Sequence, residues 1–179
     1  MGWQILFVSL LERFRKFSGH PQERLAEIGL KEGMTFLDIG CALGFYSFYA
    51  SSIIGKMGFV YALDVNPEFI EYVKNKAKRK EIKNIKTMVA NAQETGLTPE
   101  SVDIVFLHLV LHDIEDQTAA IREFNRVLKS HRKLVIDEEN VMPLDLIRRL
   151  AEDSGFRLSK RLRKTIQIFE KIKDEGNQK

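Results

Sequence analysis

Thr35-Phe36-Leu37-Asp38-Ile39-Gly40-Cys41-Ala42-Leu43-Gly44-Phe45-Tyr46-Ser47 is the stretch of sequence that decides the fold of this chain. Its apolar residues before Asp38 predict a buried strand. The small residues Gly40, Ala42 and Gly44 then let the backbone turn sharply and approach a ligand closely. From residue 45 on, apolar side chains recur at helical spacing, so the free N–H groups of a helix start would face the loop. Such a helix start is a ready place for a carboxylate or a phosphate.

The loop argues against a nicotinamide-dependent dehydrogenase. A dinucleotide fingerprint, G-x-G-x-x-G, needs glycine where this chain has Ala42 and Phe45, and Phe45 is too large for close packing of helix on strand. The stretch instead resembles motif I of the class I S-adenosylmethionine-dependent methyltransferases, an acid followed by Gly-x-Gly-x-Gly. Asp38, Gly40 and Gly44 match that motif, and Ala42 replaces its middle glycine.

Apolar runs alternate with amphipathic ones along the rest of the chain. We expect strands at 35–37, 59–63, 85–90, 102–107, 133–136, 156–162 and 165–172, and helices at 22–28, 45–53, 68–80, 116–128 and 140–150. A turn is expected at Ser130-His131-Arg132, where relatives in the resembled family have Pro-Gly-Gly. The alternation predicts an α/β, Rossmann-like seven-stranded sheet, mostly parallel, with helices on both faces and an antiparallel edge hairpin.

Ligands of open parallel sheets bind beyond the carboxyl ends of the strands, so residues that follow strands are the informative ones. Asp64 ends the second strand, where a carboxylate can accept both hydroxyl protons of a ribose; the alternative is an ordinary acid at a strand end. The resemblance implies that Asn91 binds the adenine amino group, while a turn-forming asparagine is the alternative. The complete predicted cofactor site consists of Asp38, Gly40, Cys41, Ala42, Gly44, Asp64, Val65, Asn91, Ala92 and Leu107.

The segment after the fourth strand carries the candidate catalytic residues. Residues 107–116, Leu-His-Leu-Val-Leu-His-Asp-Ile-Glu-Asp, resemble the small-molecule group that includes quinone-biosynthesis and arsenite methyltransferases, as do residues 126–129. The resemblance implies transfer of a methyl group from S-adenosylmethionine to a small molecule. Either His108 or His112 can serve as the base that removes a proton from the acceptor, or can simply pack. Cys41 is the single cysteine, which argues against arsenic as the acceptor.

Three acids follow the fifth strand: Asp137, Glu138 and Glu139. They can face the same cleft as the two histidines, and a metal site made from these five side chains is an open alternative. Because the geometry of such a set cannot be read from spacing, we predict no metal.

Composition restricts the expected number of domains, the location and the partners of the protein. The chain has 179 residues, 44% of them hydrophobic, and a net charge of +3, which fits one domain with a mixed-charge surface. We expect a cytoplasmic protein without a transmembrane segment, with a homodimer as one possible assembly. The lysine-rich face at 74–86 is interpreted as a solvated helix face, so we expect no nucleic-acid partner; RNA methylation is the alternative.

We divide the chain into three parts. Residues 1–20 form an N-terminal amphipathic helix, interpreted as a packing element, a lid or an attachment surface. Residues 21–172 form the methyltransferase domain, and residues 173–179 a frayed tail. The competing hypothesis is a non-catalytic cofactor-binding or partner-binding protein on the same fold, since a fold does not fix a function.

Overall fold

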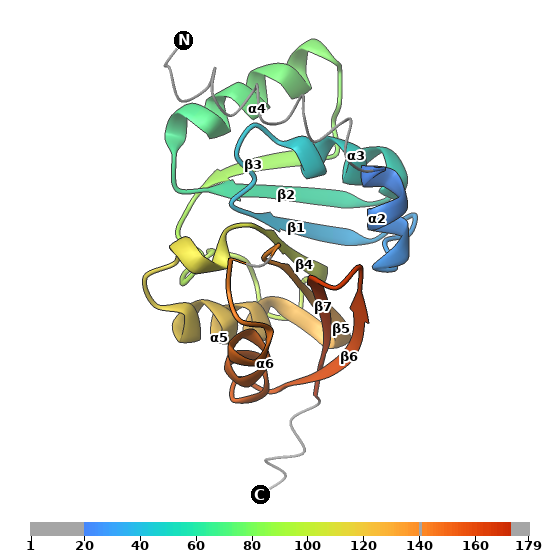
Figure 1. Cartoon of the computed structure of the whole chain (residues 1–179). Helices are drawn as coiled ribbons and strands as arrows, with labels where there is room; N and C mark the ends of the chain where they lie inside the picture. Colours follow the sequence, from blue (N-terminus) through green and yellow to red (C-terminus); the bar gives the residue numbers. More distant parts are fainter. Residues whose placement is uncertain (1–19, 140, 173–179) are drawn as a thin grey trace, which may run out of the picture. The chain divides into compact units, whose positions relative to one another are not determined.

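The computed structural model describes residues 20–139 and 141–172 (Figure 1). The predicted N-terminal amphipathic helix and the predicted frayed tail lie outside these residues, apart from His20. The described chain divides into two compact units, the first ending at Asn91 and the second beginning at Ala92.

The first unit is a three-stranded parallel sheet with helices packed on it, coloured blue to green in Figure 1. Its elements in chain order are α2 (Pro21–Glu27), β1 (Thr35–Ile39), α3 (Phe45–Ile54), β2 (Phe59–Asp64), α4 (Pro67–Arg79) and β3 (Ile85–Val89). The strand order is β3-β2-β1, and Leu37 pairs with Tyr61, which pairs with Lys86. Helices α3 and α4 pack against these strands, and α2 packs on α3. These bounds confirm the expected elements to within one or two residues.

Helix α4 shows how local sequence sets an element. Asn66 caps its start by accepting a hydrogen bond from the backbone N–H of Glu68 at 2.9 Å, and Pro67 occupies the first turn, where no N–H is needed. Ile70, Val73 and Ala77 are buried, at the spacing of one helical face. Most of the lysines lie on the opposite, exposed face, as the spacing predicts.

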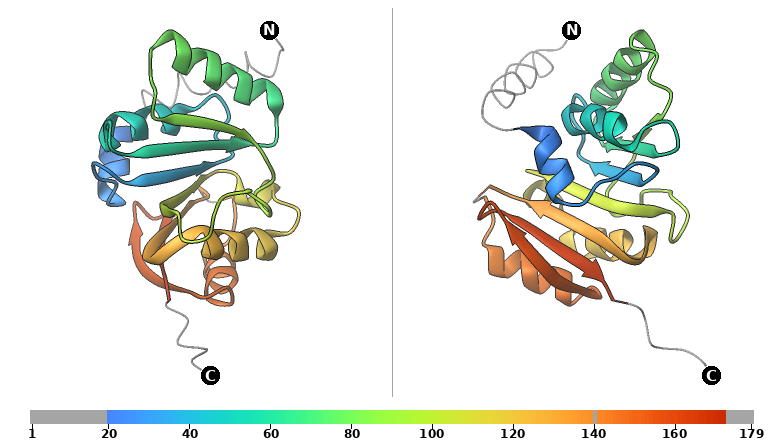
Figure 2. Two further views of the ribbon diagram at one scale, coloured as in Figure 1. Left: turned by 180° about the vertical axis from the view of Figure 1, so that it is seen from behind. Right: turned by 90° about the vertical axis from the view of Figure 1, so that its right-hand side faces the viewer.

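The second unit is a mixed sheet, coloured yellow to red (Figures 1 and 2). Its elements are β4 (Val102–His108), the 3-10 helix η1 (Leu111–Asp113), α5 (Gln117–Val127), β5 (Leu128–Asp137), α6 (Leu144–Glu152), β6 (Phe156–Leu162) and β7 (Ile166–Lys171). The strand order is β4-β5-β7-β6; β4 and β5 are parallel, while β5, β7 and β6 pair antiparallel. The seven strands among residues 20–139 and 141–172, which the structure describes, with their antiparallel pair at one edge, confirm the expected fold class.

Strand β5 corrects two of the sequence predictions. The strand expected at 133–136 extends from Leu128 to Asp137. The turn expected at Ser130-His131-Arg132 is wrong, because β5 already begins at Leu128 and these residues form an irregularity within it. Leu128 pairs with Val102, whereas Lys133 pairs with Ile104, so four residues of β5 face the single residue Asp103. This excess folds into a bulge, in which His131 takes a φ of 59°.

Two cations hold the bulge in place. The buried carboxylate of Asp103 bonds Lys129 Nζ at 2.9 Å and Arg132 Nε at 3.0 Å. A bulge held by two ion pairs therefore occupies the position at which the resembled family has a Pro-Gly-Gly turn.

The helix expected over 140–150 is also displaced. It begins at Leu144, directly after Pro143, and extends to Glu152. Proline at the N-cap position lacks an N–H group, so it is compatible with a helix start but not with a helix interior. Among the residues that the structure describes, no helix combines the length and the apolar character needed to cross a membrane.

Candidate functional site

In the loop between β1 and α3, every second residue from Gly40 to Gly44 has a left-handed backbone conformation. The φ angles are 64° at Gly40, 47° at Ala42 and 79° at Gly44. Space at Gly44 is also tight: a Cβ atom at this position would lie 3.0 Å from side-chain atoms of both Phe48 and Val73, so these side chains would have to shift. The loop closes on itself through a hydrogen bond of 2.8 Å from the N–H of Gly44 to the carbonyl of Cys41.

Ala42 is the one residue of these three that carries a side chain. Left-handed backbone costs an L-residue about 1–2 kcal/mol, because its Cβ crowds the following carbonyl. The conformation is held by a hydrogen bond of 2.9 Å from the N–H of Ala42 to Oδ2 of Asp64. The middle position of the motif therefore keeps a glycine-like conformation without a glycine.

Two buried carboxylates organise this end of the first unit. Asp38, at the end of β1, accepts a hydrogen bond from Ser47 Oγ at 2.6 Å, which ties the strand to helix α3. Asp64, at the end of β2, uses both oxygens: Oδ2 accepts from Ala42, and Oδ1 accepts from the backbone N–H of Asn66 at 2.9 Å. Each carboxylate oxygen of Asp64 retains a second lone pair for a ligand hydroxyl. Sequence reasoning placed Asp64 correctly at the strand end but missed its role in holding the loop.

The other predicted cofactor residues of the first unit differ in the solvent exposure of their side chains. Cys41 is 5% exposed and packs against Ala62 and Val73, so its side chain belongs to the core. Val65 is 67% exposed, which leaves an apolar surface beside Asp64. Asn91 is exposed at the end of the unit. Val65 and Asn91 are thus accessible from solvent, whereas the thiol of Cys41 is not.

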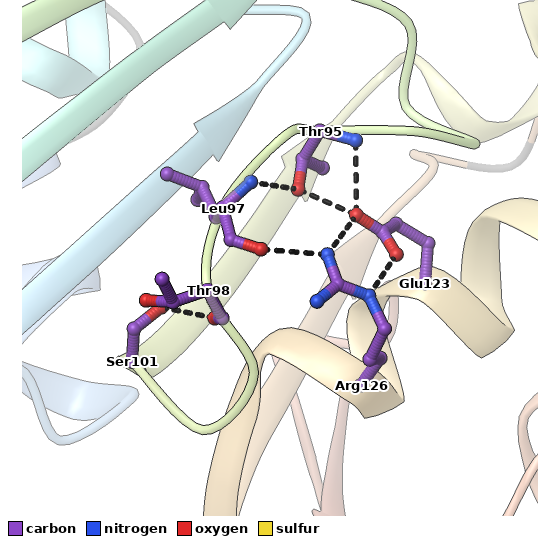
Figure 3. A network of polar contacts seen from close by, with 6 residues as sticks. All are labelled: Thr95, Leu97, Thr98, Ser101, Glu123 and Arg126. Atoms are coloured by element: carbon purple, nitrogen blue, oxygen red, sulfur yellow. Dashed lines mark hydrogen bonds and ion pairs between the residues drawn. The ribbon is translucent and has the colours of Figure 1, made fainter.

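In the second unit, hydrogen bonds connect the segment that follows Ala92 to helix α5 (Figure 3). Oε1 of Glu123 accepts from the N–H of Thr95 at 2.9 Å and from Thr95 Oγ1 at 2.6 Å. Arg126 bonds both oxygens of Glu123 and also donates to the carbonyl of Leu97 at 2.7 Å. This network fixes the loop that begins at the predicted adenine-binding residues.

The network also shifts the ionisation of its members. Burial by itself raises the pKa of Glu123, but the hydrogen bonds from Arg126 and Thr95 outweigh it and hold that pKa below its usual value. The same hydrogen bond to Glu123 raises the pKa of Arg126. Glu123 and Arg126 had no assigned role in the sequence analysis; their spacing of three residues on one helix is the signal that can identify such a pair.

His108 lies at the carboxyl end of β4 and is enclosed. Its side chain is 5% exposed and lies parallel to the ring of Phe106, with a centroid distance of 6.4 Å. Nδ1 is 3.2 Å from Oδ2 of Asp137, whose other oxygen accepts from Thr165 Oγ1 at 2.8 Å. Leu107, a predicted cofactor residue, is fully buried within the same strand.

His112 makes a second pair with a carboxylate, but it is more accessible. Its side chain is 29% exposed, and its Nδ1 lies 2.6 Å from Oε2 of Glu138. Oε1 of Glu138 accepts the backbone N–H groups of Val110 at 3.1 Å and Leu111 at 2.7 Å. The structure thus brings together two predicted histidines and two of the three predicted acids, in separate pairs.

His108, Asp137 and Glu139 are the three described residues whose arrangement comes nearest to a cation site. One ligand atom from each lies within 4.8 Å of the others. His108 and Asp137 already hydrogen-bond each other, so the geometry is that of a polar pair with an exposed acid beside it. The absence of a metal stays a prediction.

Comparison with known proteins covers nearly the whole chain. A family model described as "Methyltransferase domain" matches residues 30–177. A demethylmenaquinone methyltransferase of Staphylococcus aureus is 28% identical over 126 residues, which are 70% of this chain and 52% of that protein. The ubiquinone/menaquinone biosynthesis C-methyltransferase UbiE of a Shewanella species is 28% identical over 131 residues, 73% of this chain and 52% of that protein. The chain therefore spans about half the length of these curated relatives.

A solved structure agrees with this result. A SAM-dependent methyltransferase from Aquifex aeolicus superposes with a TM-score of 0.77 at 29% identity, covering 84% of this chain and 88% of that chain. The match extends over most of the described residues, so the expected Rossmann-like fold is confirmed by a relative as well as by the strands themselves.

Proposed function

Since this chain belongs to the methyltransferase domain family, we propose that it is an enzyme that transfers the methyl group of S-adenosylmethionine to a small-molecule acceptor. The single observation that carries the proposal is the β1–α3 loop, whose left-handed backbone at Gly40, Ala42 and Gly44 is tied to Asp64. The loop leads directly into helix α3, so a helix start and a strand-end carboxylate occur together in one unit.

The residues of the first unit suit the parts of the donor molecule. The start of α3 favours the methionyl carboxylate through the positive end of the helix dipole. The remaining lone pairs of Asp64 suit the two ribose hydroxyls, and the exposed side chain of Val65 offers an apolar surface to the adenine ring. Asn91 is assigned to the adenine edge. The donor, when bound, supplies the electrophilic methyl group; the protein supplies position and a dry environment.

For the acceptor, we propose a hydroquinone-type ring. The support comes from the two curated relatives, which are named as methyltransferases of menaquinone and ubiquinone biosynthesis. A hydroquinone carries an acidic hydroxyl, and a histidine base paired with a carboxylate suits its deprotonation. A cytoplasmic location and a homodimer belong to this proposal as well; both stay predictions.

Calorimetry with S-adenosylmethionine and with S-adenosylhomocysteine tests the donor site. Asp64→Asn is expected to weaken binding by about 1.5–3 kcal/mol, because it removes a charged acceptor from the hydroxyls. Asn66→Ala is the matched control: it removes the cap of α4 two residues away but leaves the backbone bond to Asp64 in place. Unchanged affinity in Asp64→Asn would refute the ribose assignment.

Turnover is tested with 2-prenyl-1,4-naphthohydroquinone under anaerobic conditions, with the product detected by mass spectrometry. A mass gain of one methyl group, dependent on the donor, supports the proposed reaction. One specific observation still supports the non-catalytic alternative: Ala42 carries a side chain in a loop whose conformation is typical of glycine. Tight donor binding without turnover of any hydroquinone or phenol would favour that alternative.

A further inference from the structure

The two histidines of the second unit are not equivalent. His108 is 5% exposed and stacks on Phe106, whereas the side chain of His112 is 29% exposed. A base has to reach the proton that it removes, within about 3 Å or through one water. Of the two, His112 is the one whose side chain is exposed enough for an acceptor to approach.

Glu138 holds His112 in a defined way. Its carboxylate is 1% exposed, and its Oε2 lies 2.6 Å from Nδ1 of His112. An ionised carboxylate only accepts hydrogen bonds, so the neutral imidazole carries its proton on Nδ1 and leaves the lone pair on Nε2. This is the tautomer that a general base needs, with the accepting nitrogen on the side away from Glu138.

The same carboxylate also fixes the segment that carries the histidine. Oε1 of Glu138 accepts the backbone N–H groups of Val110 and Leu111, immediately before η1. One buried side chain therefore sets both the position of the turn and the orientation of the ring. Asp113 completes the surroundings: its exposed carboxylate has Oδ2 at 3.5 Å from Nε2 of His112. A positive charge that develops on the imidazole thus has a carboxylate near each nitrogen.

We propose that His112 is the catalytic base and that Glu138 is its positioning residue. The inference rests on the proposed methyltransferase function. In the step, the hydroxyl proton of the acceptor moves to Nε2 of His112. The electron pair left on the acceptor forms the new bond to the methyl carbon, while the carbon–sulfur bond breaks and its pair stays on sulfur. For a ring-carbon acceptor, the carbon then loses its proton and the oxygen regains one, so each cycle releases one proton.

Glu138→Gln tests the positioning role with little change of shape. The two backbone N–H groups require an acceptor, so the amide oxygen is expected to stay on them. The amide NH₂ group then faces Nδ1 of His112 and can only donate. The imidazole proton is therefore expected to move to Nε2, which blocks the lone pair that the reaction uses.

The first measurement is the tautomer of His112, from ¹⁵N spectra of histidine-labelled protein; the chain has 4 histidines. The wild type is expected to carry the proton on Nδ1, and Glu138→Gln on Nε2. A wild-type proton on Nε2, or no change in the variant, overturns the positioning role. This measurement decides the inference even if the naphthohydroquinone is not a substrate, so its failure is distinct from failure of the proposed function.

The second measurement is turnover of the same naphthohydroquinone. Glu138→Gln is expected to lower kcat about 10²–10⁴-fold, with the KM of the donor unchanged, because general-base catalysis contributes about that much. Glu115→Gln, which removes an exposed carboxylate of the same segment, is the matched control and should behave like the wild type. A kcat of Glu138→Gln within twofold of the wild type contradicts the proposal.

Discussion

Replacing Ala42 by glycine should stabilise this protein, although alanine-to-glycine changes usually destabilise. At a φ of 47°, the side chain of Ala42 costs about 1–2 kcal/mol. Glycine removes that strain but gives the unfolded chain more freedom, which costs about 0.4–1 kcal/mol. The balance is a gain of about 0.5–1 kcal/mol, or roughly 1–4 °C in Tm for a chain of this size. The hydrogen bond from residue 42 to Asp64 uses the backbone N–H and survives the change.

Urea denaturation followed by circular dichroism measures this balance. Ala26→Gly is the matched control, because Ala26 is an exposed residue of helix α2, where glycine is expected to cost about 0.5–1 kcal/mol. The two substitutions are chemically identical and are predicted to have opposite signs. If Ala42→Gly destabilises as much as Ala26→Gly, the strain assigned to the loop is wrong.

Three further predictions concern other parts of the fold. Gly44→Ala should destabilise by about 2–4 kcal/mol in urea denaturation, because its Cβ meets Phe48 and Val73 at 3.0 Å and its φ is 79°. Because the pKa of Glu123 is lowered in the folded protein, its ionised carboxylate stabilises the fold at pH values above the ordinary glutamate pKa of about 4.3. This stabilisation is lost as the pH falls through the lowered pKa of the folded state. Glu123→Gln should therefore flatten the fall in stability below about pH 5, measured as urea midpoints against pH. Asp103→Asn should cost about 1–3 kcal/mol by thermal unfolding, because it weakens the hydrogen bonds to the cations of the β5 bulge.

The elements of the first unit were predictable because their signals are local. The apolar run of β1, the asparagine cap and first-turn proline of α4, and the position of Asp64 after β2 can each be identified within a few neighbouring residues. The bulge of β5 was not predictable. It depends on pairing across two strands, in which Asp103 meets Lys129 and Arg132.

The same contrast between local signals and long-range contacts applies to the loop after β1 and to the histidine–carboxylate pairs. By itself, the sequence determined that Gly40 to Gly44 form a tight turn, because small residues after a short apolar strand permit few other conformations. Only the tertiary structure decided that Ala42 adopts left-handed backbone and that Asp64 holds it. It also decided which acid serves which histidine, since Glu138 lies 26 residues from His112 in the chain. The physical reason is that backbone preference acts between neighbouring residues, whereas a hydrogen bond between distant side chains exists only once the strands that carry them are in register.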